Sequence, residues 1–470
     1  MVNIRSLSFH YQNSDDASLN DISLHIHTGE CVLLCGESGC GKTTVTRLLN
    51  GLIPHYYEGI LEGSADVCGM DIRETPLEEI AVKVGSVFQN PRSQFFCVDT
   101  TGELAFGCEN MGLPENEIRN RIDEVVQNMH IEPLLDRNIF NLSGGEKQKI
   151  ACAGVSVMNP ELFVLDEPTS NLDTDAIEML KDILQLWKRK GKTIVIAEHR
   201  LGWLSEIADR VVLMQGGRIT ATYNSTEFFS MQDTELNALG LRGIQEEKNY
   251  LHTRTGFYPC DNAATSDSEC YRLCNFDFSY HKNKPVLHLN DIDIPKHSVV
   301  AVVGHNGAGK STFSRCLCGL QKNFRGSIRC GSTTYKPRQL RSLCYFVMQD
   351  VNHQLFTDSV IEEIMLGMNE PDESAALDVL GRMDLTEFKD RHPMSLSGGQ
   401  KQRTAICSAY LSERDILIFD EPTSGLDFRR MQETADLIET LSRDKTIFIV
   451  THDMELIAKC CTHILHLEHE

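Results

Sequence analysis

The chain has 470 residues, of which 41% are hydrophobic and 24% are charged. This length predicts more than one domain, and the composition is that of an ordinary folded protein. The formal charge of -22 argues against a nucleic-acid-binding protein, which needs a basic surface. A local basic patch is still compatible with this net charge. No apolar run approaches the roughly 18 to 20 residues of a membrane-spanning helix, and the N-terminus lacks the apolar core of a secretory signal. We therefore expect a cytosolic protein that reaches a membrane only through partners.

The first informative stretch is a glycine-rich loop between an apolar run (31–35) and a segment that can continue a helix (45–50). It reads Gly36-Glu37-Ser38-Gly39-Cys40-Gly41-Lys42-Thr43-Thr44 and fits the phosphate-binding pattern G-x-x-x-x-G-K-[ST]. Its glycines allow backbone N–H groups to turn toward phosphate oxygens at a helix N-terminus. Lys42 is expected to reach the β- and γ-phosphates, and the Thr43 hydroxyl to help hold Mg²⁺.

Further along the chain, the polar sequence Ser143-Gly144-Gly145 opens a predicted helix, so its hydroxyl and glycine amides form an expected anion receptor. Asp166 ends an apolar run, which predicts a carboxylate at the tip of a strand, where Mg²⁺ can be held through water. Glu167 follows and can act as a general base for an attacking water. His199 ends the next predicted strand and can contact the γ-phosphate, although a histidine at a strand end is often only structural.

All of these segments recur in the same order in the second half of the chain. The second loop is Gly304-His305-Asn306-Gly307-Ala308-Gly309-Lys310-Ser311-Thr312, and the later segments return as Ser397-Gly398-Gly399, Asp420, Glu421 and His452. The repeat indicates a tandem duplication of one α/β domain with parallel strands and helical crossovers. We predict a first domain at 1–235, a linker at 236–268 and a second domain at 269–470. Charged helices are expected at Glu115 to Met129 and around Glu373 to Met383.

The order and spacing of these motifs resemble the nucleotide-binding domain of ABC ATPases, twice over nearly the whole chain. The resemblance implies two tandem P-loop NTPase domains, each with a mainly parallel sheet core, an antiparallel strand-rich subdomain and a helical subdomain. It implies that Gln89 and Gln349 sense Mg²⁺ and water, and that Tyr11 and Tyr280 stack on adenine, with a core or surface tyrosine as the alternative. It also implies that Ser397 completes the ATP site of Lys42, and Ser143 that of Lys310, within one chain or between two copies.

Finer features resemble the tandem ATPases of energy-coupling factor (ECF) transporters. The segments that carry this resemblance are 50–56, 87–96, 198–201 and, more loosely, 348–356. It implies an importer motor at the cytoplasmic face of the membrane, bound to an integral membrane scaffold subunit and a substrate-binding membrane subunit. The expected cargo is a vitamin, a vitamin precursor or a transition-metal ion. The alternative is a soluble ABC ATPase that acts on ribosomes or DNA, which the acidic charge and the lack of room for long insertions disfavour.

Three local expectations follow. Phe95, Phe96, Leu355 and Phe356 either form a docking surface for the scaffold subunit or pack into the core. Cys40, in a phosphate loop near a helix N-terminus, is expected to have a lowered pKa and to block nucleotide binding when alkylated. Arg200 follows His199 where Asp453 follows His452, so the two sites are expected to be able to turn over ATP at unequal rates.

Overall fold

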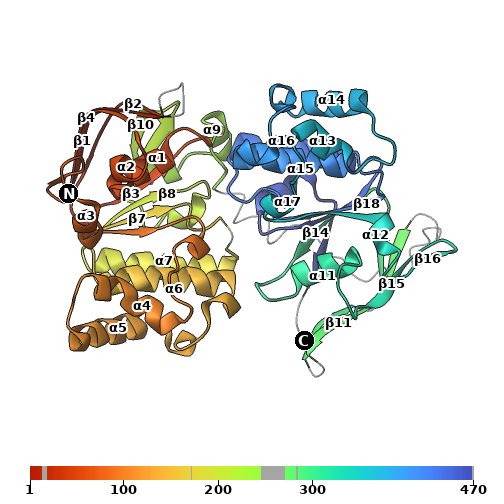
Figure 1. Cartoon of the computed structure of the whole chain (residues 1–470), viewed down its shortest axis with the longest axis horizontal. Coiled ribbons are helices and arrows are strands. Elements are labelled where there is room, and N and C mark those ends of the chain that lie inside the picture. Colours follow the sequence, from red (N-terminus) through yellow and green to blue (C-terminus); the bar gives the residue numbers. More distant parts are fainter. Residues whose placement is uncertain (13–17, 171, 245–269, 282–283, 290, 468–470) are drawn as a thin grey trace. The chain divides into compact units, whose positions relative to one another are not determined.

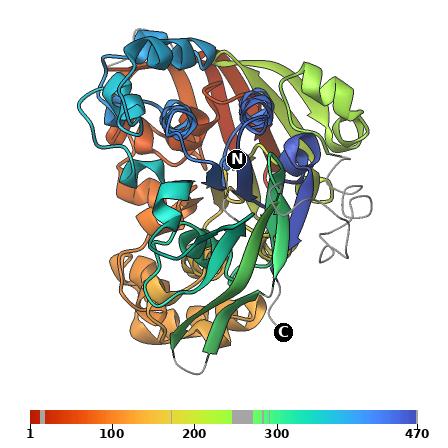
Figure 2. The same ribbon diagram turned by 90° about the vertical axis from the view of Figure 1, so that its right-hand side faces the viewer.

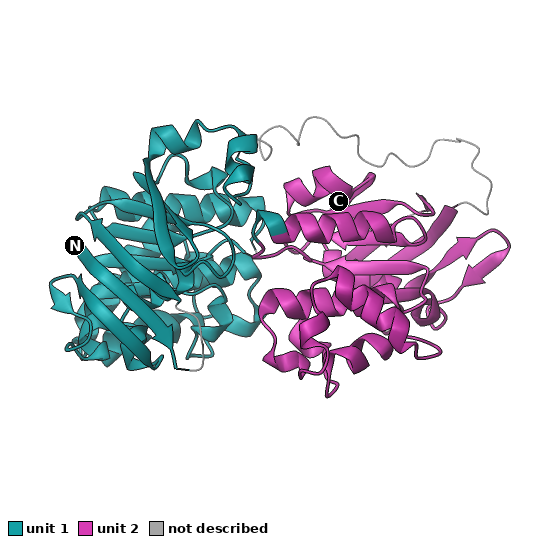
Figure 3. Ribbon diagram, turned by 90° about the horizontal axis from the view of Figure 1, so that it is seen from above, with its two compact units in different colours: residues 1–248, 427–429 teal, residues 249–426, 430–470 magenta. Residues whose placement is uncertain are grey.

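The computed structural model describes residues 1–12, 18–170, 172–244, 270–281, 284–289 and 291–467. The chain divides into two compact units, residues 1–248 with 427–429 and residues 249–426 with 430–470 (Figure 3). Each unit contains a mainly parallel sheet, an antiparallel sheet and a group of helices (Figure 1). The α/β prediction with both kinds of sheet is therefore confirmed.

The parallel sheet of the first unit has the strand order β10-β9-β3-β8-β7-β6, in which only the β9–β10 pair is antiparallel. Its strands are β3 (Cys31–Cys35), β6 (Val84–Val87), β7 (Leu162–Asp166), β8 (Thr193–Ala197), β9 (Arg210–Gln215) and β10 (Arg218–Asn224). Every residue of β3 and β8 is buried, because the sheet is covered on both faces. Along β3, Leu33 packs into the core shared with α6 (Gly144–Met158) and α7 (Thr174–Arg189), whereas Leu34 packs toward α1 (Lys42–Leu49).

The antiparallel sheet of the first unit has the order β2-β1-β4-β5. Its strands are β1 (Val2–Tyr11), β2 (Leu19–Ile26), β4 (Gly59–Val67) and β5 (Met70–Asp71). The helical group comprises α4 (Thr100–Asn110), α5 (Glu115–Met129) and α6, which confirms the helix predicted at 115–129. The shorter helices of this unit are α2 (Leu52–His55), α3 (Leu77–Lys83), α8 (Ser225–Phe229) and α9 (Asp233–Ala238).

The second unit repeats this plan. Its parallel sheet has the order β17-β18-β19-β14-β20, which matches β6-β7-β8-β3-β9 strand for strand. The strands are β14 (Val299–Val303), β17 (Cys344–Val347), β18 (Ile416–Asp420), β19 (Thr446–Val450) and β20 (His463–His466). The antiparallel sheet, drawn in green in Figure 2, is built on β11 (Cys270–His281), with β12 (Lys284–Leu289), β13 (Ile292–Pro295), β15 (Arg325–Cys330) and β16 (Thr333–Tyr335).

The helices of the second unit follow the same sequence of roles. They are α11 (Lys310–Leu317), α12 (Leu340–Leu343), α13 (Val360–Met365), α14 (Glu373–Arg382), α15 (Gly398–Tyr410), α16 (Phe428–Leu441) and α17 (Met454–Cys460). Of these, α14 confirms the helix predicted around 373–383. Helices α13, α14 and α15 enclose their own apolar cluster, which corresponds to the helical group of the first unit.

The start of the predicted linker is folded onto the first unit. Residue 236 lies in α9, and Leu236, Leu241 and Ile244 are buried in the core of that unit. The remainder of the predicted linker, 245–268, lies outside the described residues, so the boundaries 1–235 and 269–470 remain predictions. Within the described part of the chain, no helix is both long enough and apolar enough to span a membrane.

Candidate functional site

The two phosphate loops are built alike. The first joins β3 to α1, and the second joins β14 to α11. Gly41 and Gly309 precede the two helices with φ of +102° and +93°, and no side chain caps either helix. Since glycine has no side chain that could cap a helix, the start of each helix is suited to an anion such as a phosphate group.

The lysine of each loop is held over the loop by backbone carbonyls. The Nζ of Lys42 donates to the carbonyl oxygens of Gly36 at 2.8 Å and Glu37 at 3.0 Å. The Nζ of Lys310 donates to the corresponding carbonyls of Gly304 and His305, at 2.7 Å and 3.0 Å. Both lysines are buried, so each loop holds a positive charge in the same position.

A hydroxyl and a carboxylate meet beside each lysine. The Thr43 Oγ1 donates to Asp166 Oδ1 at 3.2 Å, and Ser311 hydrogen-bonds Asp420 in the second unit. Burial raises the pKa of Asp166 to about 6, with a contribution from the charge of Glu167, and burial also raises the pKa of Asp420. A hydroxyl and a carboxylate are hard oxygen donors of the kind that Mg²⁺ prefers. Among the described residues no group of three or more His, Cys, Asp or Glu could hold a metal ion, so the remaining ligands would have to come from the nucleotide and water.

In the first unit, two predicted side chains converge on Glu167. Its Oε2 accepts a hydrogen bond from Gln89 Nε2 at 2.8 Å, and its Oε1 lies 3.3 Å from His199 Nε2. Burial raises the pKa of Glu167 to about 7, against the opposing effect of Lys42. Burial, and then Lys42, lower the pKa of His199 well below its usual value. The structure thus brings together a carboxylate, an imidazole and an amide from three separate strand ends.

In the second unit, the corresponding glutamate and histidine lie slightly farther apart. The Oε1 of Glu421 lies 4.0 Å from His452 Nε2, and its Oε2 accepts from Thr451 Oγ1 at 3.2 Å. Gln349 is exposed after β17, where Gln89 follows β6.

Both glutamates have an unusual backbone. Glu167 has φ of +44° and Glu421 has φ of +51°, in the left-handed region that non-glycine residues rarely occupy. Each is held there by a backbone hydrogen bond of 2.8 Å, from Glu167 to Ala197 and from Glu421 to Val450. Strain of this kind persists where the surrounding structure fixes it and clusters at functional sites. Other non-glycine residues of the chain also have a positive φ, so the conformation is consistent with a functional role of the two glutamates but does not by itself identify them.

Tyr11 and Tyr280 lie beside the phosphate loops. The hydroxyl of Tyr11 is 3.5 Å from Thr44 Oγ1, and that of Tyr280 is 3.2 Å from Thr312 Oγ1. Tyr280 is 53% exposed, and Tyr11 is partly exposed, so neither is a core residue. Adenine stacking by these rings remains a prediction.

The predicted anion receptors are helix N-termini with capping boxes. Ser143 accepts from the N–H of Glu146 at 3.2 Å and Glu146 accepts from the N–H of Ser143 at 2.7 Å. Ser397 and Gln400 form the same pair at the start of α15. Each serine hydroxyl uses its oxygen as an acceptor, which leaves its proton available to an anion. Gly144, Gly145, Gly398 and Gly399 form the first turns of these helices.

These motifs can now be set against known proteins. The family described as ABC transporter matches residues 19–170 and 287–424, which hold the motifs of both units. The chain is 43% identical over 482 residues to a "Putative ABC transporter ATP-binding protein" of Treponema denticola, covering 99% of this chain and 95% of the relative. The chain belongs to the ABC transporter family. As an ABC protein with both phosphate loops it binds ATP, and it is an ATPase.

Other comparisons agree with this assignment. The "Putative HMP/thiamine import ATP-binding protein YkoD" of Bacillus subtilis is 31% identical, over 99% of this chain and 90% of that protein. Among solved structures, a chain of the "Model of ribosome-bound archaeal Pelota and ABCE1" has a TM-score of 0.69 and 19% identity, covering 98% of this chain and 76% of that one. At this identity the structural likeness shows the fold alone.

The lowered pKa expected for Cys40 is wrong. The thiol is 4% exposed, and burial raises its pKa above the usual value despite the nearby Lys42 ammonium. The helix N-terminus favours a thiolate, but desolvation of the charged form is the larger effect here. The raised pKa disfavours the thiolate form of Cys40, and the effect of alkylation on nucleotide binding stays a prediction.

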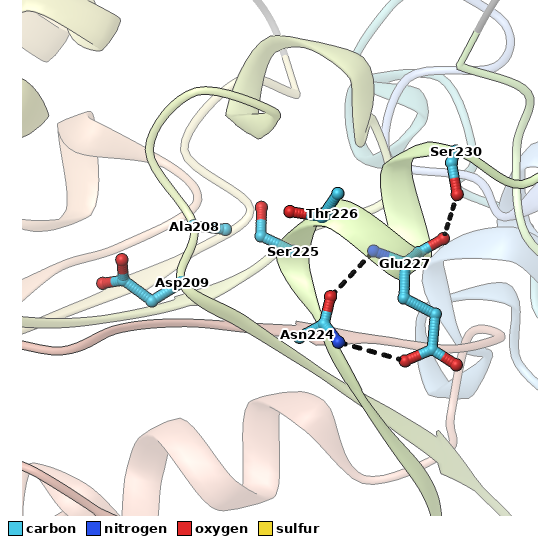
Figure 4. Close-up of a pocket in the computed structure, with 7 residues that line it drawn as sticks. All are labelled: Ala208, Asp209, Asn224, Ser225, Thr226, Glu227 and Ser230. Atoms are coloured by element: carbon cyan, nitrogen blue, oxygen red, sulfur yellow. Dashed lines mark hydrogen bonds between the residues drawn. The ribbon is translucent and has the colours of Figure 1, made fainter.

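A shallow polar hollow of about 680 Å³ lies around the start of α8, and its lining includes none of the candidate site residues (Figure 4). Its polar groups satisfy one another, since Asn224 Oδ1 accepts from the Glu227 N–H at 2.8 Å and Ser230 Oγ donates to the Glu227 carbonyl at 2.8 Å. This hollow belongs to the local capping of a short helix.

Proposed function

We propose that this ABC ATPase is the motor of an ECF-type importer. In this proposal, Mg²⁺-dependent ATP hydrolysis at the cytoplasmic face of the membrane drives uptake of a vitamin, a vitamin precursor or a transition-metal ion. The membrane is crossed by an integral scaffold subunit and a substrate-binding membrane subunit.

The observation that carries the proposal is an apolar cavity of about 620 Å³ in the first unit. It lies among α3, β6, α4 and α6, and the segment after Gln89 contributes to its wall. Phe96 lines it and is 75% exposed, with its ring stacked on Phe106 at a centroid distance of 4.8 Å. A large exposed aromatic ring at an apolar cavity is typical of a protein docking site.

The second unit presents a corresponding aromatic residue. Phe356 is 71% exposed in the segment after Gln349. Its neighbour Leu355 is only 3% exposed, and Phe95 packs against the core of the first unit. Core packing therefore accounts for Leu355 and Phe95 but not for Phe96 and Phe356, which we assign to docking of a helix from the scaffold subunit.

The comparisons support import over the alternative. The Bacillus subtilis relative, matched over nearly the whole chain, carries an import name. The ribosome-associated neighbours share the fold at 19% to 20% identity, and a net charge of -22 is unfavourable for a ribosome or DNA partner.

Within this function each candidate residue has a role. Lys42, Lys310 and the two loops bind the ATP phosphates, and Tyr11 and Tyr280 contact the adenine. The side chains that would hold Mg²⁺, directly or through water, are Thr43, Gln89, Asp166, Ser311, Gln349 and Asp420. Bound Mg²⁺ would neutralise charge on the phosphate oxygens. Glu167 and Glu421 accept a proton from the attacking water, and His199 and His452 orient that water and the γ-phosphate. By the family resemblance, Ser143 and Ser397 would each complete the site of the other kind of unit, within one chain or between two copies.

The test is purification of the tagged chain from detergent-solubilised membranes of its own host, followed by identification of the bound proteins. We expect two integral membrane proteins to be recovered with it. Phe96→Asp and Phe356→Asp should each reduce this recovery, because a charge would be buried against an apolar helix. Leu320→Asp, at another exposed apolar residue (45%), is the matched control. Recovery of ribosomal subunits or DNA, with no membrane protein, would replace the import proposal by its alternative.

A further inference from the structure

The segments that carry the two histidines differ on both sides of the imidazole. The first unit has Glu198-His199-Arg200, and the second has Thr451-His452-Asp453. Glu198 and Asp453 are both buried, at 2% and 4% exposure. A carboxylate is buried only where several donors satisfy it, so the partners of each indicate what it does.

In the second unit, Asp453 connects the histidine segment to the turn that follows the general base. Its Oδ2 accepts from the Thr423 hydroxyl at 2.6 Å, and Thr423 lies two residues after Glu421. Its Oδ1 accepts from the Leu456 N–H at 3.2 Å and so caps α17. One carboxylate thereby fixes both segments that enter the site.

In the first unit, Glu198 makes the corresponding connection from the other side of the histidine. Its Oε1 accepts from both the N–H and the hydroxyl of Thr169, which lies two residues after Glu167. Its Oε2 accepts from the His199 N–H at 2.7 Å. Thr169 and Thr423 occupy the same place in the repeat, so the two carboxylates hold the same hydroxyl.

The different position of the carboxylate in the two units also accounts for the residues found at positions 200 and 451. The side chain of Arg200 reaches the Leu172 carbonyl at 3.5 Å, and its backbone N–H lies 3.4 Å from Glu198 Oε2. In the second unit, where Asp453 holds the turn, position 451 is a threonine whose hydroxyl donates to Glu421 at 3.2 Å. In each unit, a buried carboxylate thus joins the histidine segment to the threonine that follows the glutamate. The carboxylate precedes the histidine in the first unit and follows it in the second.

We propose that Glu198 is the positioning residue of the first ATP site. It fixes the position of His199 relative to Glu167, as Asp453 fixes that of His452 relative to Glu421. This inference rests on the hydrolytic roles proposed for Glu167 and His199, and it is independent of the import function. The carboxylate that follows His452 in the second unit thus has its counterpart one residue before His199 in the first.

The test compares ATP turnover of purified variants that also carry Glu421→Gln, so that the first site dominates. Glu198→Gln keeps the shape of the side chain but turns an amide NH₂ toward the N–H and O–H donors of Thr169 or toward the His199 N–H. We therefore expect kcat to fall about 10- to 100-fold, the usual range when the support of a functional group is lost. The KM for ATP should change by less than about 3-fold, because the phosphate loop is untouched. Glu198→Thr combined with Arg200→Asp copies the second unit and should turn over at least about 10-fold faster than Glu198→Thr alone.

Asp453→Asn in a chain with Glu167→Gln is the mirror-image control, and the same fall in kcat is expected there. If the Glu421→Gln variant has no turnover, Glu198→Thr is compared with Glu198→Thr plus Arg200→Asp in a chain that keeps Glu421. Wild-type kcat in Glu198→Gln, or failure of Arg200→Asp to rescue Glu198→Thr, would overturn the inference. Glu167→Gln is measured in parallel, and an unaffected rate in that variant would instead contradict the role of the general base.

Discussion

At the residue scale, burial has the largest effect on the pKa values of the candidate site in the first unit. It raises the pKa of Glu167 to about 7 and lowers that of His199 well below its usual value. A general base works in its ionised form, and its ionised fraction decreases as the pH falls through the pKa. At neutral pH the imidazole is then uncharged while the carboxyl group is partly protonated.

We therefore predict a pH dependence for the first site. In the Glu421→Gln variant, kcat/KM should be high above about pH 8 and should fall up to tenfold per unit below about pH 6, since kcat/KM reports the free enzyme. Steady-state ATPase assays between pH 5.5 and 9, with thermal melts to confirm folding at each pH, measure this. A flat profile across pH 6 to 8 would contradict a base with a raised pKa.

The two units retain the same set of reacting residues, which predicts two hydrolytic sites. Glu167→Gln and Glu421→Gln should each lower ATP turnover and leave a measurable remainder, and the two remainders should differ because the contacts around the two glutamates differ. The double variant should lose at least about 100-fold, as expected for removal of a general base. If either single change abolishes all turnover, the sites are not independent.

At the element scale, the turn from β3 into the phosphate loop depends on close backbone packing. Gly36 has φ of +147°, and a Cβ there would lie 2.2 Å from the Met214 carbonyl oxygen on the neighbouring strand β9. Gly39 also has a positive φ, +80°, but a Cβ there would meet no atom within 4 Å. Substitution of Gly39 therefore tests the backbone strain alone, whereas substitution of Gly36 tests the strain together with the steric collision.

Gly36→Ala should therefore destabilise the first unit more than Gly39→Ala does, by about 1 to 3 kcal/mol, the usual cost of overpacking. Denaturant unfolding of the two variants measures the difference, and ATP binding by Gly36→Ala should weaken along with stability. Equal stabilities would show that the loop can shift away from Met214 without cost.

At the scale of the whole molecule, the proposed pairing makes each ATP site depend on the opposite unit. Ser397→Arg should then suppress turnover in the Glu421→Gln background, where the Lys42 site is active, and should matter less in the Glu167→Gln background. Ser143→Arg should show the reverse pattern. Each arginine would place a bulky side chain at a capped helix start, so thermal stability is checked for both. If each change instead affects the site of its own unit, the crossed arrangement is wrong.

Much of the fold was predictable because the chain repeats itself. Two copies of the same motifs, with apolar runs before each loop and each Asp-Glu pair, predicted two parallel sheets and the helices at 115–129 and around 373. The family and the ATPase activity followed from motif order. Cys40 was misjudged because a sequence position near a helix N-terminus does not reveal how deeply the thiol is buried.

The sequence alone predicted which residues would bind phosphate, hold Mg²⁺ and activate water, because these chemistries need particular side chains at fixed spacings. The tertiary structure decided three further points. It showed that Phe96 and Phe356 are exposed while Leu355 is buried. It placed both general-base candidates in a strained left-handed conformation. It also revealed that Glu198 and Asp453, on opposite sides of their histidines, hold equivalent threonines. Exposure, backbone strain and long-range hydrogen bonds all depend on residues distant in the chain, so no local pattern can specify them.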